Sequence, residues 1–403
     1  MMTEKEPQAE IKSLLLPKEE MLEIRRKGKK ITIGIPSDFD KIEYRIPLTP
    51  EAVELLVSYG HEIYIEKDAG KASSYSDMEY RNAGAVVVEK REEIFQCDIV
   101  LRVSPFDSDE IDLLRGHQTL ISNMQLSTHC QETVQKLMKK KVTTIAYEYM
   151  ENDEKYLPVV RLMSQIAGAT SITLASEYLS NSRNGKGVLL GGVTGISPTE
   201  LVILGATTAA EYATRAALGL GATVKIFDDN LLNLSQLEQK FPQRLFTSVL
   251  YPNVLKKALK SADVVLGALS FNSSTNFQVS EEMVKGMKPG SVIIDLNTSQ
   301  GGCFETSYPT DLKNPTFVKH GVVHYCVHNM ASIVARTASI ALSNILAPII
   351  ITVGEIGGMQ NYIKNSTGIR KGVYIYNGIL TNKDLGQKLN IPSKDIDLLL
   401  AIF

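Results

Sequence analysis

Leu201-Val-Ile-Leu-Gly205-Ala-Thr-Thr-Ala-Ala210 is an apolar run that ends in a glycine and leads into the helix-like segment Glu211 to Gly219. The run Ala222-Thr-Val-Lys-Ile-Phe227 comes next and is followed by Asp228 and Asp229. A strand, a helix and a second strand in this order predict a βαβ unit. An acid about 20 residues after the glycine stands where such units bind the ribose of a dinucleotide.

The glycine pattern of this unit departs at one position from the dinucleotide-binding fingerprint G-x-G-x-x-G/A. The three positions hold Gly205, Thr207 and Ala210. Alanine is allowed at the third position, but Thr207 replaces the glycine whose missing Cβ lets the backbone approach the pyrophosphate. The sequence therefore predicts a cofactor-binding plan that is altered at its contact point.

Length and composition indicate a soluble globular protein of two or three domains. The chain has 403 residues, of which 44% are hydrophobic and 22% charged, and its net charge of −2 gives no electrostatic reason to bind nucleic acid. The four cysteines lie at positions 97, 130, 303 and 326. Their spacing fits neither a metal site nor a disulfide framework, so we expect no metal and a cytoplasmic, reducing location.

No segment predicts a targeting signal or a membrane partner. Residues 1–30 are charged and contain only Leu14-Leu-Leu16 as an apolar run, so we expect a solvated N-terminal extension. The longest apolar stretch lies between Arg336 and Gly354, which is too short and too interrupted for a span of about 20 apolar residues. We interpret it as a buried helix.

The rest of the chain alternates between strands and helices. In the first part the expected strands are Ile31–Ile35, His61–Glu66, Ala85–Val88, Ile99–Val103, Thr119–Ile121 and Thr143–Ala146. A helix is expected from Pro50 to Tyr59, with Thr49 as its N-cap. The second part adds a small-residue-rich helix over Met163–Asn181, strands at Val264–Ala268 and Ser291–Asp295, and a last helical region over Ala331–Leu346. This alternation predicts mostly parallel sheets covered on both faces.

Seven segments of the chain carry a family resemblance in a fixed order. They are Ile33-Gly-Ile-Pro36 with Glu43-Tyr-Arg45-Ile-Pro-Leu-Thr49-Pro50, Gly60-His61-Glu62 with Ala69-Gly70, Ile145-Ala-Tyr147-Glu148, Met163-Ser-Gln-Ile-Ala167-Gly168, Gly187-Val-Leu-Leu-Gly191-Gly192-Val-Thr-Gly195, Gln300-Gly-Gly-Cys303-Phe-Glu305 and Tyr325-Cys-Val-His-Asn329-Met330. Together they resemble alanine dehydrogenase, in the family that includes the NAD-binding subunit of proton-pumping transhydrogenase.

The resemblance implies two Rossmann-like, doubly wound α/β domains with a cleft between them. Residues 31–160 and 334–403 form the substrate domain, residues 161–333 form the NAD-binding domain, and residues 1–30 are an extension. The family reaction is the reversible, NAD-dependent oxidative deamination of L-alanine to pyruvate and ammonia. The family also implies a homo-oligomer and a small carboxylate as the partner molecule.

Several site residues carry over from the family pattern. Arg45 matches the arginine that binds the substrate carboxylate, a task that suits a guanidinium fork. Glu148 matches an acid that lines the cleft, although a structural hydrogen-bonding role fits it equally well. Asn329 and Met330 match positions beside the nicotinamide. Asp228 matches the acid on the adenosine ribose, and its alternative role is that of a solvated turn residue after the strand.

Other positions depart from the family pattern at the chemistry. The substrate-binding lysine is replaced by Ser104, the catalytic histidine by Gln125, the catalytic aspartate by Ser299 and the second loop glycine by Thr207. Glutamine cannot shuttle a proton near neutral pH, and serine carries no charge. The resemblance therefore implies a retained scaffold with changed or lost activity, and weak or lost binding of NAD.

Three functions remain open from the sequence. The chain is a working alanine dehydrogenase in which displaced groups, such as His129 or Arg102, replace the missing ones. Alternatively, it is a catalytically inactive family member that binds a small carboxylate or serves a regulatory or structural role. The third possibility is an enzyme that acts on a different ligand in the same cleft.

Overall fold

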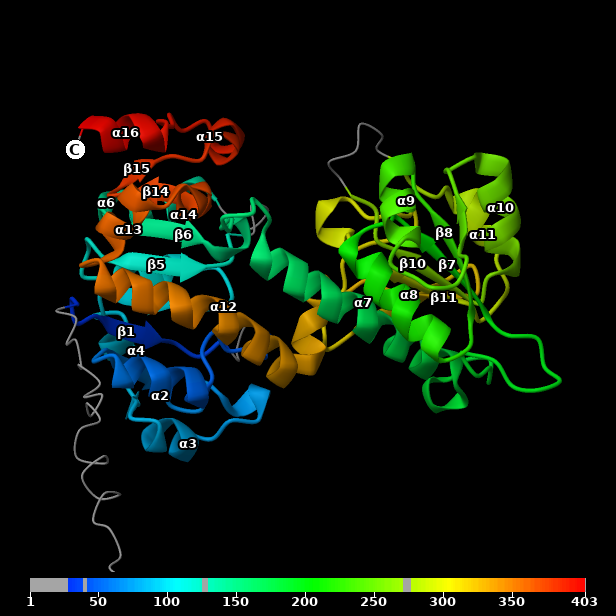
Figure 1. The fold of residues 1–403 in the computed structure, drawn as a ribbon, viewed down its shortest axis with the longest axis horizontal. Coiled ribbons are helices and arrows are strands. Elements are labelled where there is room, and N and C mark those ends of the chain that lie inside the picture. The colour runs from blue at the N-terminus through cyan, green and yellow to red at the C-terminus, as the bar shows by residue number, and fades with distance from the viewer. Residues whose placement is uncertain (1–27, 39–41, 125–129, 271–276, 403) are drawn as a thin grey trace, which may run out of the picture.

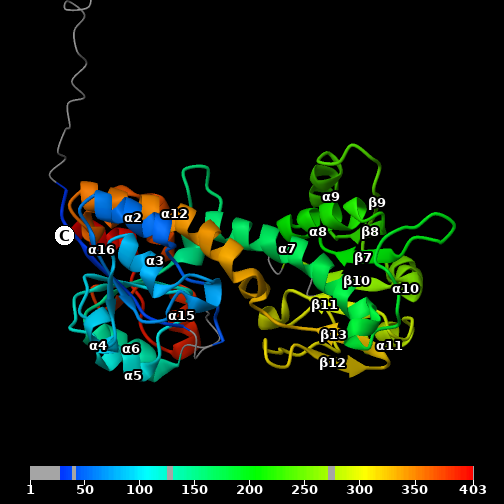
Figure 2. The ribbon, with the colours of Figure 1, turned by 90° about the horizontal axis from the view of Figure 1, so that it is seen from below.

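The structure, a computed structural model, describes residues 28–38, 42–124, 130–270 and 277–402 and contains two β-sheets. Figure 1 shows the sheets side by side, with two long helices, α7 and α12, running between them. Figure 2 shows the same two helices crossing from one sheet to the other in a second view. The predicted α/β class with two mostly parallel sheets is confirmed.

The first sheet has eight strands in the order β15-β14-β6-β5-β4-β1-β2-β3. Their bounds are β1 Thr32–Ile35, β2 Glu62–Glu66, β3 Val86–Val88, β4 Ile99–Leu101, β5 Thr119–Ser122, β6 Thr143–Ala146, β14 Val373–Tyr376 and β15 Ile379–Leu380. Strands β1 to β6 pair in parallel, and β14 and β15 add an antiparallel edge. The strand order reverses between β1 and β4, which is where ligands bind in doubly wound sheets.

The second sheet repeats this plan with seven strands in the order β12-β13-β11-β10-β7-β8-β9. Their bounds are β7 Glu200–Leu204, β8 Thr223–Phe227, β9 Phe246–Ser248, β10 Val264–Gly267, β11 Val292–Asp295, β12 Thr316–Lys319 and β13 Val322–Tyr325. All pairs are parallel except β12 with β13. Here the order reverses between β7 and β10, so the predicted βαβ unit starts at the reversal point.

Helices cover both sheets. Their bounds are α2 Pro50–Ser58, α3 Asp77–Asn82, α4 Arg91–Ile94, α5 Ser108–Asp112, α6 Gln131–Lys139, α7 Pro158–Leu179, α8 Thr208–Gly219, α9 Leu231–Glu238, α10 Pro252–Ser261, α11 Glu281–Lys285, α12 Ala335–Glu355, α13 Met359–Asn365, α14 Thr367–Gly372, α15 Lys383–Leu389 and α16 Ile396–Ile402. Helices α7 and α8 pack closely, because Gly168 lies against the backbone of Ala209, where a Cβ would come within 2.1 Å of the carbonyl oxygen. The small residues of α7 thus serve helix packing, as the sequence predicts.

The apolar stretch near the C-terminus is the helix α12, which continues from the short 3₁₀ helix η6 (Met330–Val334). Residues Met330–Glu355 are long and apolar enough to span a membrane, with a mean hydropathy of 1.7, but half of the most apolar window is buried inside the protein. Ala338, Leu342 and Leu346 lie on its buried face. The helix is therefore part of the core, and it contacts both α2 and α7.

Most element boundaries differ from the expected ones by one to three residues. Helix α8 starts at Thr208, three residues before the expected start, because Thr207 is its N-cap. Thr49 is the N-cap of α2 as expected, but its side chain makes no capping hydrogen bond. The division of the chain into domains at residues 160 and 333 stays a prediction. Most of the extension, residues 1–27, lies outside the described residues.

Candidate active site

The reversal point of the first sheet is occupied by a buried ionic network. Asp38 follows β1, and Arg102 and Ser104 follow β4. Oδ1 of Asp38 accepts a hydrogen bond from the Ser104 hydroxyl at 2.6 Å and is paired with Arg102. Oδ2 accepts the backbone N–H groups of Val103 and Ser104, each at 3.1 Å. Ser104, where the family pattern has a lysine, is therefore part of the protein's own hydrogen-bond network.

Arg102 is the buried cation of this network. Its side chain is fully buried, and Nη1 donates to Glu110 at 2.7 Å. Burial would lower the pKa of Arg102, but the carboxylates of Asp38 and Glu110 outweigh burial and raise it. Because both ends of the guanidinium are bound, this geometry does not support the idea that Arg102 replaces the substrate-binding lysine.

Arg45 is held along one edge by an acid two residues earlier. Nε and Nη2 of Arg45 donate to the two carboxylate oxygens of Glu43 at 2.8 and 2.7 Å. Its Nη1 points to the sulfur of Met163 on α7, at 3.5 Å. Burial acts to lower the pKa of Arg45, but Glu43 outweighs it and raises the pKa. The guanidinium is therefore charged and fixed in orientation.

Serine hydroxyls of η6 and α12 fix the segment that carries Arg45. The backbone N–H groups of Tyr44, Ile46 and Thr49 donate to the hydroxyls of three serines at 2.9, 2.8 and 2.7 Å. These partners are, in the same order, Ser332, Ser339 and Ser343. Residues that are almost 300 positions apart in the sequence thus set the position of the arginine.

The loop after β13, a strand of the second sheet, contacts the acid that holds Arg45. The Asn329 amide lies 3.5 Å from Oε2 of Glu43, and the Ser332 hydroxyl donates to Oε1 of Glu43 at 2.8 Å. Arg45 and Asn329, both predicted site residues, are therefore brought together through Glu43. The side chain of Met330 is buried in the core of the second sheet. A contact of Asn329 or Met330 with a nicotinamide stays a prediction.

The reversal point of the second sheet has the backbone of a dinucleotide site. Gly205 has φ +104°, and a Cβ on it would meet the carbonyl oxygen of Ala268 at 2.2 Å, so only glycine fits. Ala210 is buried in the first turn of α8. Helix α8 has twelve residues and starts directly after the loop, as a phosphate-binding helix does.

The side chain of Thr207 forms hydrogen bonds with backbone groups of this crevice. Its hydroxyl donates to the carbonyl of Ala268, after β10, at 3.2 Å and accepts the N–H of Ala210 at 3.4 Å. The side chain therefore reaches from the start of α8 to the end of β10. The loop has the strand–glycine–helix arrangement of the fingerprint, whereas the Thr207 side chain does not offer the open approach that the fingerprint glycine provides.

Asp228 is turned toward the protein backbone. Its Oδ2 accepts the N–H of Ala206 at 2.6 Å and its Oδ1 that of Asn230 at 2.8 Å. Asp228 is only 3% exposed, so it is not a solvated turn residue. Burial raises the pKa of Asp228, partly offset by these two backbone hydrogen bonds. Binding of a ribose by this acid stays a prediction, and in the structure its oxygens hold the loop after β7.

The remaining substituted positions lie at the ends of β5 and β11. Ser299 is exposed in a short 3₁₀ helix, η5 (Thr298–Gln300), after β11. Asp295, at the end of β11, is fully buried and accepts the N–H groups of Asn297 and Cys303 at 3.0 and 2.8 Å. It therefore shapes the Gln-Gly-Gly-Cys loop. Gln125 and His129 lie outside the described residues.

Glu148 supports the segment before Gln125. Its Oε1 accepts the N–H of Met124 at 2.7 Å, and Tyr147 beside it donates to the carbonyl of Val103 at 2.9 Å. The structural hydrogen-bonding role that the sequence left open for Glu148 is therefore present. A role as a cleft-lining acid toward a ligand stays a prediction.

Sequence reasoning missed Glu43, Asp38 and the three serines as parts of the site. Glu43 and Arg45 have the i, i+2 spacing that places two side chains on one side of an extended segment. Ser339 and Ser343 have the i, i+4 spacing of one helix face. These spacings are visible in the sequence, but only the fold shows which segments they contact.

Two family models match nearly all of the described chain. The model described as "Alanine dehydrogenase/PNT, N-terminal domain" matches residues 34–167, and "Alanine dehydrogenase/PNT, C-terminal domain" matches residues 171–383. An alanine dehydrogenase of Methanococcus maripaludis is 38% identical over 363 residues, which are 89% of this chain and 97% of that protein. One of Mycolicibacterium smegmatis is 35% identical over 373 residues, or 92% of this chain and all of that protein.

Solved structures agree with these relatives. A structure titled L-alanine dehydrogenase superposes with a TM-score of 0.83 at 34% identity and covers 89% of this chain and 98% of its own. A transhydrogenase structure from Sinorhizobium meliloti, at 23% identity and a TM-score of 0.72 over 87% of this chain and 99% of its own, shares the fold. With both family models matched and relatives at 34–38% identity over nearly their whole length, this chain belongs to the alanine dehydrogenase family.

Proposed function

We propose that this chain is a family member in which NAD-dependent alanine oxidation is absent or at least ~10³-fold reduced, and in which Arg45 still binds a small carboxylate. The observation that carries the proposal is the contrast between two positions. Arg45 is preoriented by Glu43 through two hydrogen bonds of 2.8 and 2.7 Å. Ser104, where the family has a lysine, is instead bound to Asp38.

The geometry around Arg45 supports carboxylate binding. Glu43 uses the edge formed by Nε and Nη2, and the other contact of the guanidinium is the Met163 sulfur at 3.5 Å. A thioether is a weak acceptor, so a ligand carboxylate is a much better partner for Nη1. The two positions at which the family pattern has its catalytic histidine and aspartate hold Gln125 and Ser299, which transfer no proton near neutral pH.

Weak or lost binding of NAD is part of the proposal. The Thr207 hydroxyl is bound to Ala268 and Ala210, and the Asp228 carboxylate is bound to Ala206 and Asn230. A dinucleotide that binds as the fingerprint prescribes has to displace these contacts. A misfit of a few kcal/mol weakens binding by roughly 10²-fold or more, since about 1.4 kcal/mol is tenfold.

The second candidate function is the family reaction at a low rate. Its support is the similarity to alanine dehydrogenases along almost the whole chain, together with His328, which directly precedes Asn329. Partial burial lowers the pKa of His328, Glu43 raises it and Arg45 lowers it, so this histidine lies in the electrostatic field of the Arg45 site. A neutral imidazole can accept a proton near pH 7. An enzyme acting on a different ligand is the third candidate.

We propose a cytoplasmic homo-oligomer that has a small carboxylate as its ligand and neither nucleic acid nor membrane as a partner. The formal net charge of −2 and the half-buried helix α12 support the last two parts. Oligomerisation rests on the family resemblance alone.

The test combines calorimetry with a steady-state assay. Pyruvate and L-alanine are titrated into the wild-type protein, with and without NADH, and into Arg45→Gln. Arg161→Gln is the matched control, because Arg161 is an exposed arginine that lies over the Tyr156 ring. We expect binding of pyruvate to the wild type and the control, and at least tenfold weaker binding to Arg45→Gln.

The assay uses alanine with NAD, and pyruvate with ammonia and NADH, at high enzyme concentration. A kcat on the order of 10 s⁻¹, which is near the enzyme median, contradicts the loss of activity. If a low rate is present and His328→Gln abolishes it without changing pyruvate affinity, the second candidate is correct. A folded protein that binds neither carboxylate has a cleft adapted to another ligand.

A further inference from the structure

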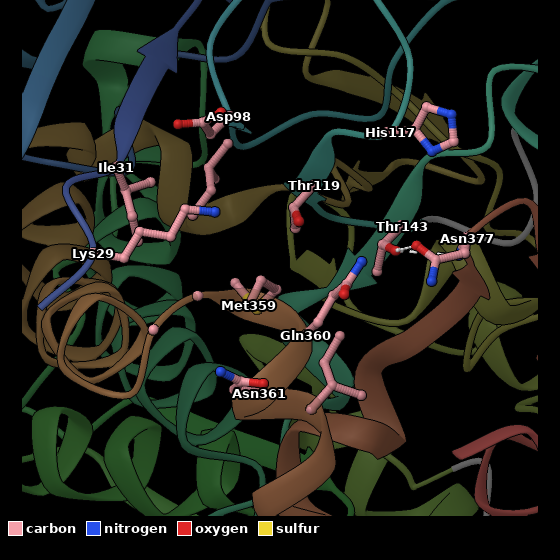
Figure 3. Close-up of a pocket in the computed structure, with 14 residues that line it drawn as sticks. Lys29, Ile31, Asp98, His117, Thr119, Thr143, Met359, Gln360, Asn361 and Asn377 are labelled. Atoms are coloured by element: carbon pink, nitrogen blue, oxygen red, sulfur yellow. Dashed lines mark hydrogen bonds between the residues drawn. The ribbon is translucent and has the colours of Figure 1, made fainter. Parts of the chain in front are cut away.

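A hollow of about 240 Å³ lies at the edge of the first sheet opposite to Ser104 and Asp38. Its walls include Asp98, Thr119 and Thr143, which precede or begin β4, β5 and β6. Figure 3 shows these side chains together with Lys29 and Gln360 around one space. The hollow therefore has no part in the Arg45 site.

Two buried threonines on adjacent strands face this hollow and differ in their hydrogen bonding. Thr143 is 5% exposed, and its hydroxyl donates to the Asn377 amide oxygen at 3.3 Å and accepts the Asn377 N–H at 3.2 Å. Thr119 is 8% exposed, and no residue of the described segments forms a hydrogen bond with its hydroxyl. This hydroxyl faces the hollow, where it can donate a hydrogen bond to a ligand or accept one from it.

The charges around the hollow favour an anion. Within residues 28–38, 42–124, 130–270 and 277–402, no carboxylate forms an ion pair with the Lys29 ammonium. The one acid in the wall, Asp98, is already compensated by Arg115 at 2.5 Å and by the Thr32 backbone and hydroxyl at 3.2 and 3.1 Å. Among the described residues, Lys29 is therefore a cation of this wall that no acid neutralises, and Figure 3 shows its side chain extending along the wall.

We propose that this hollow binds a small anion through a phosphate or carboxylate group, which is held by the Lys29 ammonium and the Thr119 hydroxyl. The amide of Gln360 and the imidazole of His117 lie in the same wall and supply further polar contacts. Drug-sized ligands use pockets of about 300–1,000 Å³, so this smaller volume fits inorganic phosphate or a metabolite of a few carbon atoms. The proposal does not depend on the function of Arg45.

The first experiment uses the full chain carrying Arg45→Gln, so that anion binding at Arg45 makes no contribution. Inorganic phosphate and acetate are titrated separately at constant ionic strength set with chloride, and binding is followed by calorimetry and by ³¹P line width. Lys29→Gln is compared with Lys30→Gln, since Lys30 is an exposed neighbour paired with Glu62. We expect Lys29→Gln to weaken binding at least tenfold and Lys30→Gln to leave it unchanged.

The two anions distinguish the sources of the charged group. Tighter binding of phosphate identifies a phosphate ligand, and tighter binding of acetate identifies a carboxylate ligand. Equal loss of binding in both lysine variants means that binding depends on the general surface charge and not on the hollow, and this overturns the proposal. Absence of binding of either anion to the unsubstituted hollow also overturns it.

The second experiment tests the hydroxyl with conservative substitutions. Thr119→Val removes the unbonded hydroxyl, and Thr119→Ser keeps it. We expect Thr119→Val to lose at least tenfold in affinity without a lower melting temperature, and Thr119→Ser to bind like the parent protein. Thr143→Val is the control for folding, since its hydroxyl is bonded to Asn377, and we expect it to lower the melting temperature. Unchanged affinity in Thr119→Val overturns the assignment of this residue.

Discussion

The two sheets share the order of their six parallel strands but fill their reversal points with different chemistry. Between β1 and β4, Asp38, Arg102 and Ser104 form a buried ionic network. Between β7 and β10, Gly205 and Thr207 bring uncharged groups against the backbone of Ala268. In both places the protein's own groups make contacts in the region where ligands bind in folds of this topology.

A common topology thus supplies a crevice and leaves its contents to single residues. The crevice between β1 and β4 is held by charged groups, and removing one of them leaves another charge buried without its partner. The crevice between β7 and β10 is spanned by one threonine hydroxyl, whose two hydrogen bonds are 3.2 and 3.4 Å long. We therefore expect the second crevice to be much easier to change than the first.

The largest expected effect comes from restoring the family residues at both crevices. Ser104→Lys, Gln125→His, Ser299→Asp and Thr207→Gly are introduced together. A general acid–base group alone contributes ~10²–10⁴ in rate, so we expect alanine oxidation to rise by at least ~10²-fold. Steady-state assays with alanine and NAD measure this, and a variant set that omits Gln125→His is the control. A folded quadruple variant without any gain shows that the cleft has been rebuilt for another ligand.

Removing the buried arginine tests the stability of the charged crevice. Arg102→Ala leaves Asp38 and Glu110 buried without their cation, and breaking a buried pair in this way costs about 3–5 kcal/mol. Arg115→Ala is the control, because the pair of Arg115 with Asp98 is half-exposed and worth at most about 1 kcal/mol. Denaturant unfolding measures both. Equal losses in the two variants disprove the special role of the network.

Substituting the threonine tests how easily the crevice between β7 and β10 changes. Thr207→Gly removes the side chain at the contact point, and we expect affinity for NADH to rise by roughly 10-fold to 10²-fold. Replacing a threonine N-cap by glycine costs only a few tenths of a kcal/mol, so stability changes little. Thr207→Ser keeps the cap and the Cβ and serves as the control. Submicromolar affinity for NADH in the wild type contradicts the premise, and fluorescence titration decides.

A smaller expected effect is a difference between two buried acids, Glu43 and Asp295, in how their contribution to stability depends on pH. Burial raises the pKa of Glu43, but Arg45 and Ser332 outweigh it and hold the pKa below its ordinary 4.5. Glu43 therefore contributes stability that is complete above pH 4.5 and is lost as the pH falls through the folded pKa. Burial raises the pKa of Asp295 above its ordinary 3.8, so its contribution falls as the pH rises from 3.8 through the folded pKa.

Urea unfolding between pH 3 and pH 7 measures this contrast against Glu43→Gln and Asp295→Asn. We expect the wild-type advantage over Glu43→Gln to grow with pH, and the advantage over Asp295→Asn to shrink with pH. Two differences that change in the same direction contradict the opposite pKa shifts. Taking differences between variants cancels the titration of all other groups.

Much of the fold follows from local patterns in the sequence. The apolar run before Gly205 and the alternation around it are enough to place β7, α8 and β8. The hairpin of β12 and β13 was not predicted. Its turn, His320 and Gly321, has φ values of 55° and 75°, as in a two-residue hairpin turn, but histidine and glycine are a weaker signal than asparagine and glycine.

The candidate site is less predictable, because its contacts join distant segments. The family pattern singles out Arg45 and Ser104 one by one. It does not show that Ser104 bonds to Asp38, 66 positions earlier, or that Arg45 is held by Glu43. A pattern identifies the type of residue at a position, whereas the direction of a hydrogen bond depends on how the strands are placed side by side.

The serine hydroxyls of η6 and α12 have a consequence for the kinetics of amide exchange. Tyr44, Ile46 and Thr49 lie outside the sheets, yet their N–H groups donate to hydroxyls at 2.9, 2.8 and 2.7 Å. Loop amides normally exchange with solvent deuterium quickly, because local opening is cheap. These three amides exchange only when the segment separates from α12 and η6. Their exchange rates therefore record how often the segment bearing Arg45 leaves its support, without any ligand or assay.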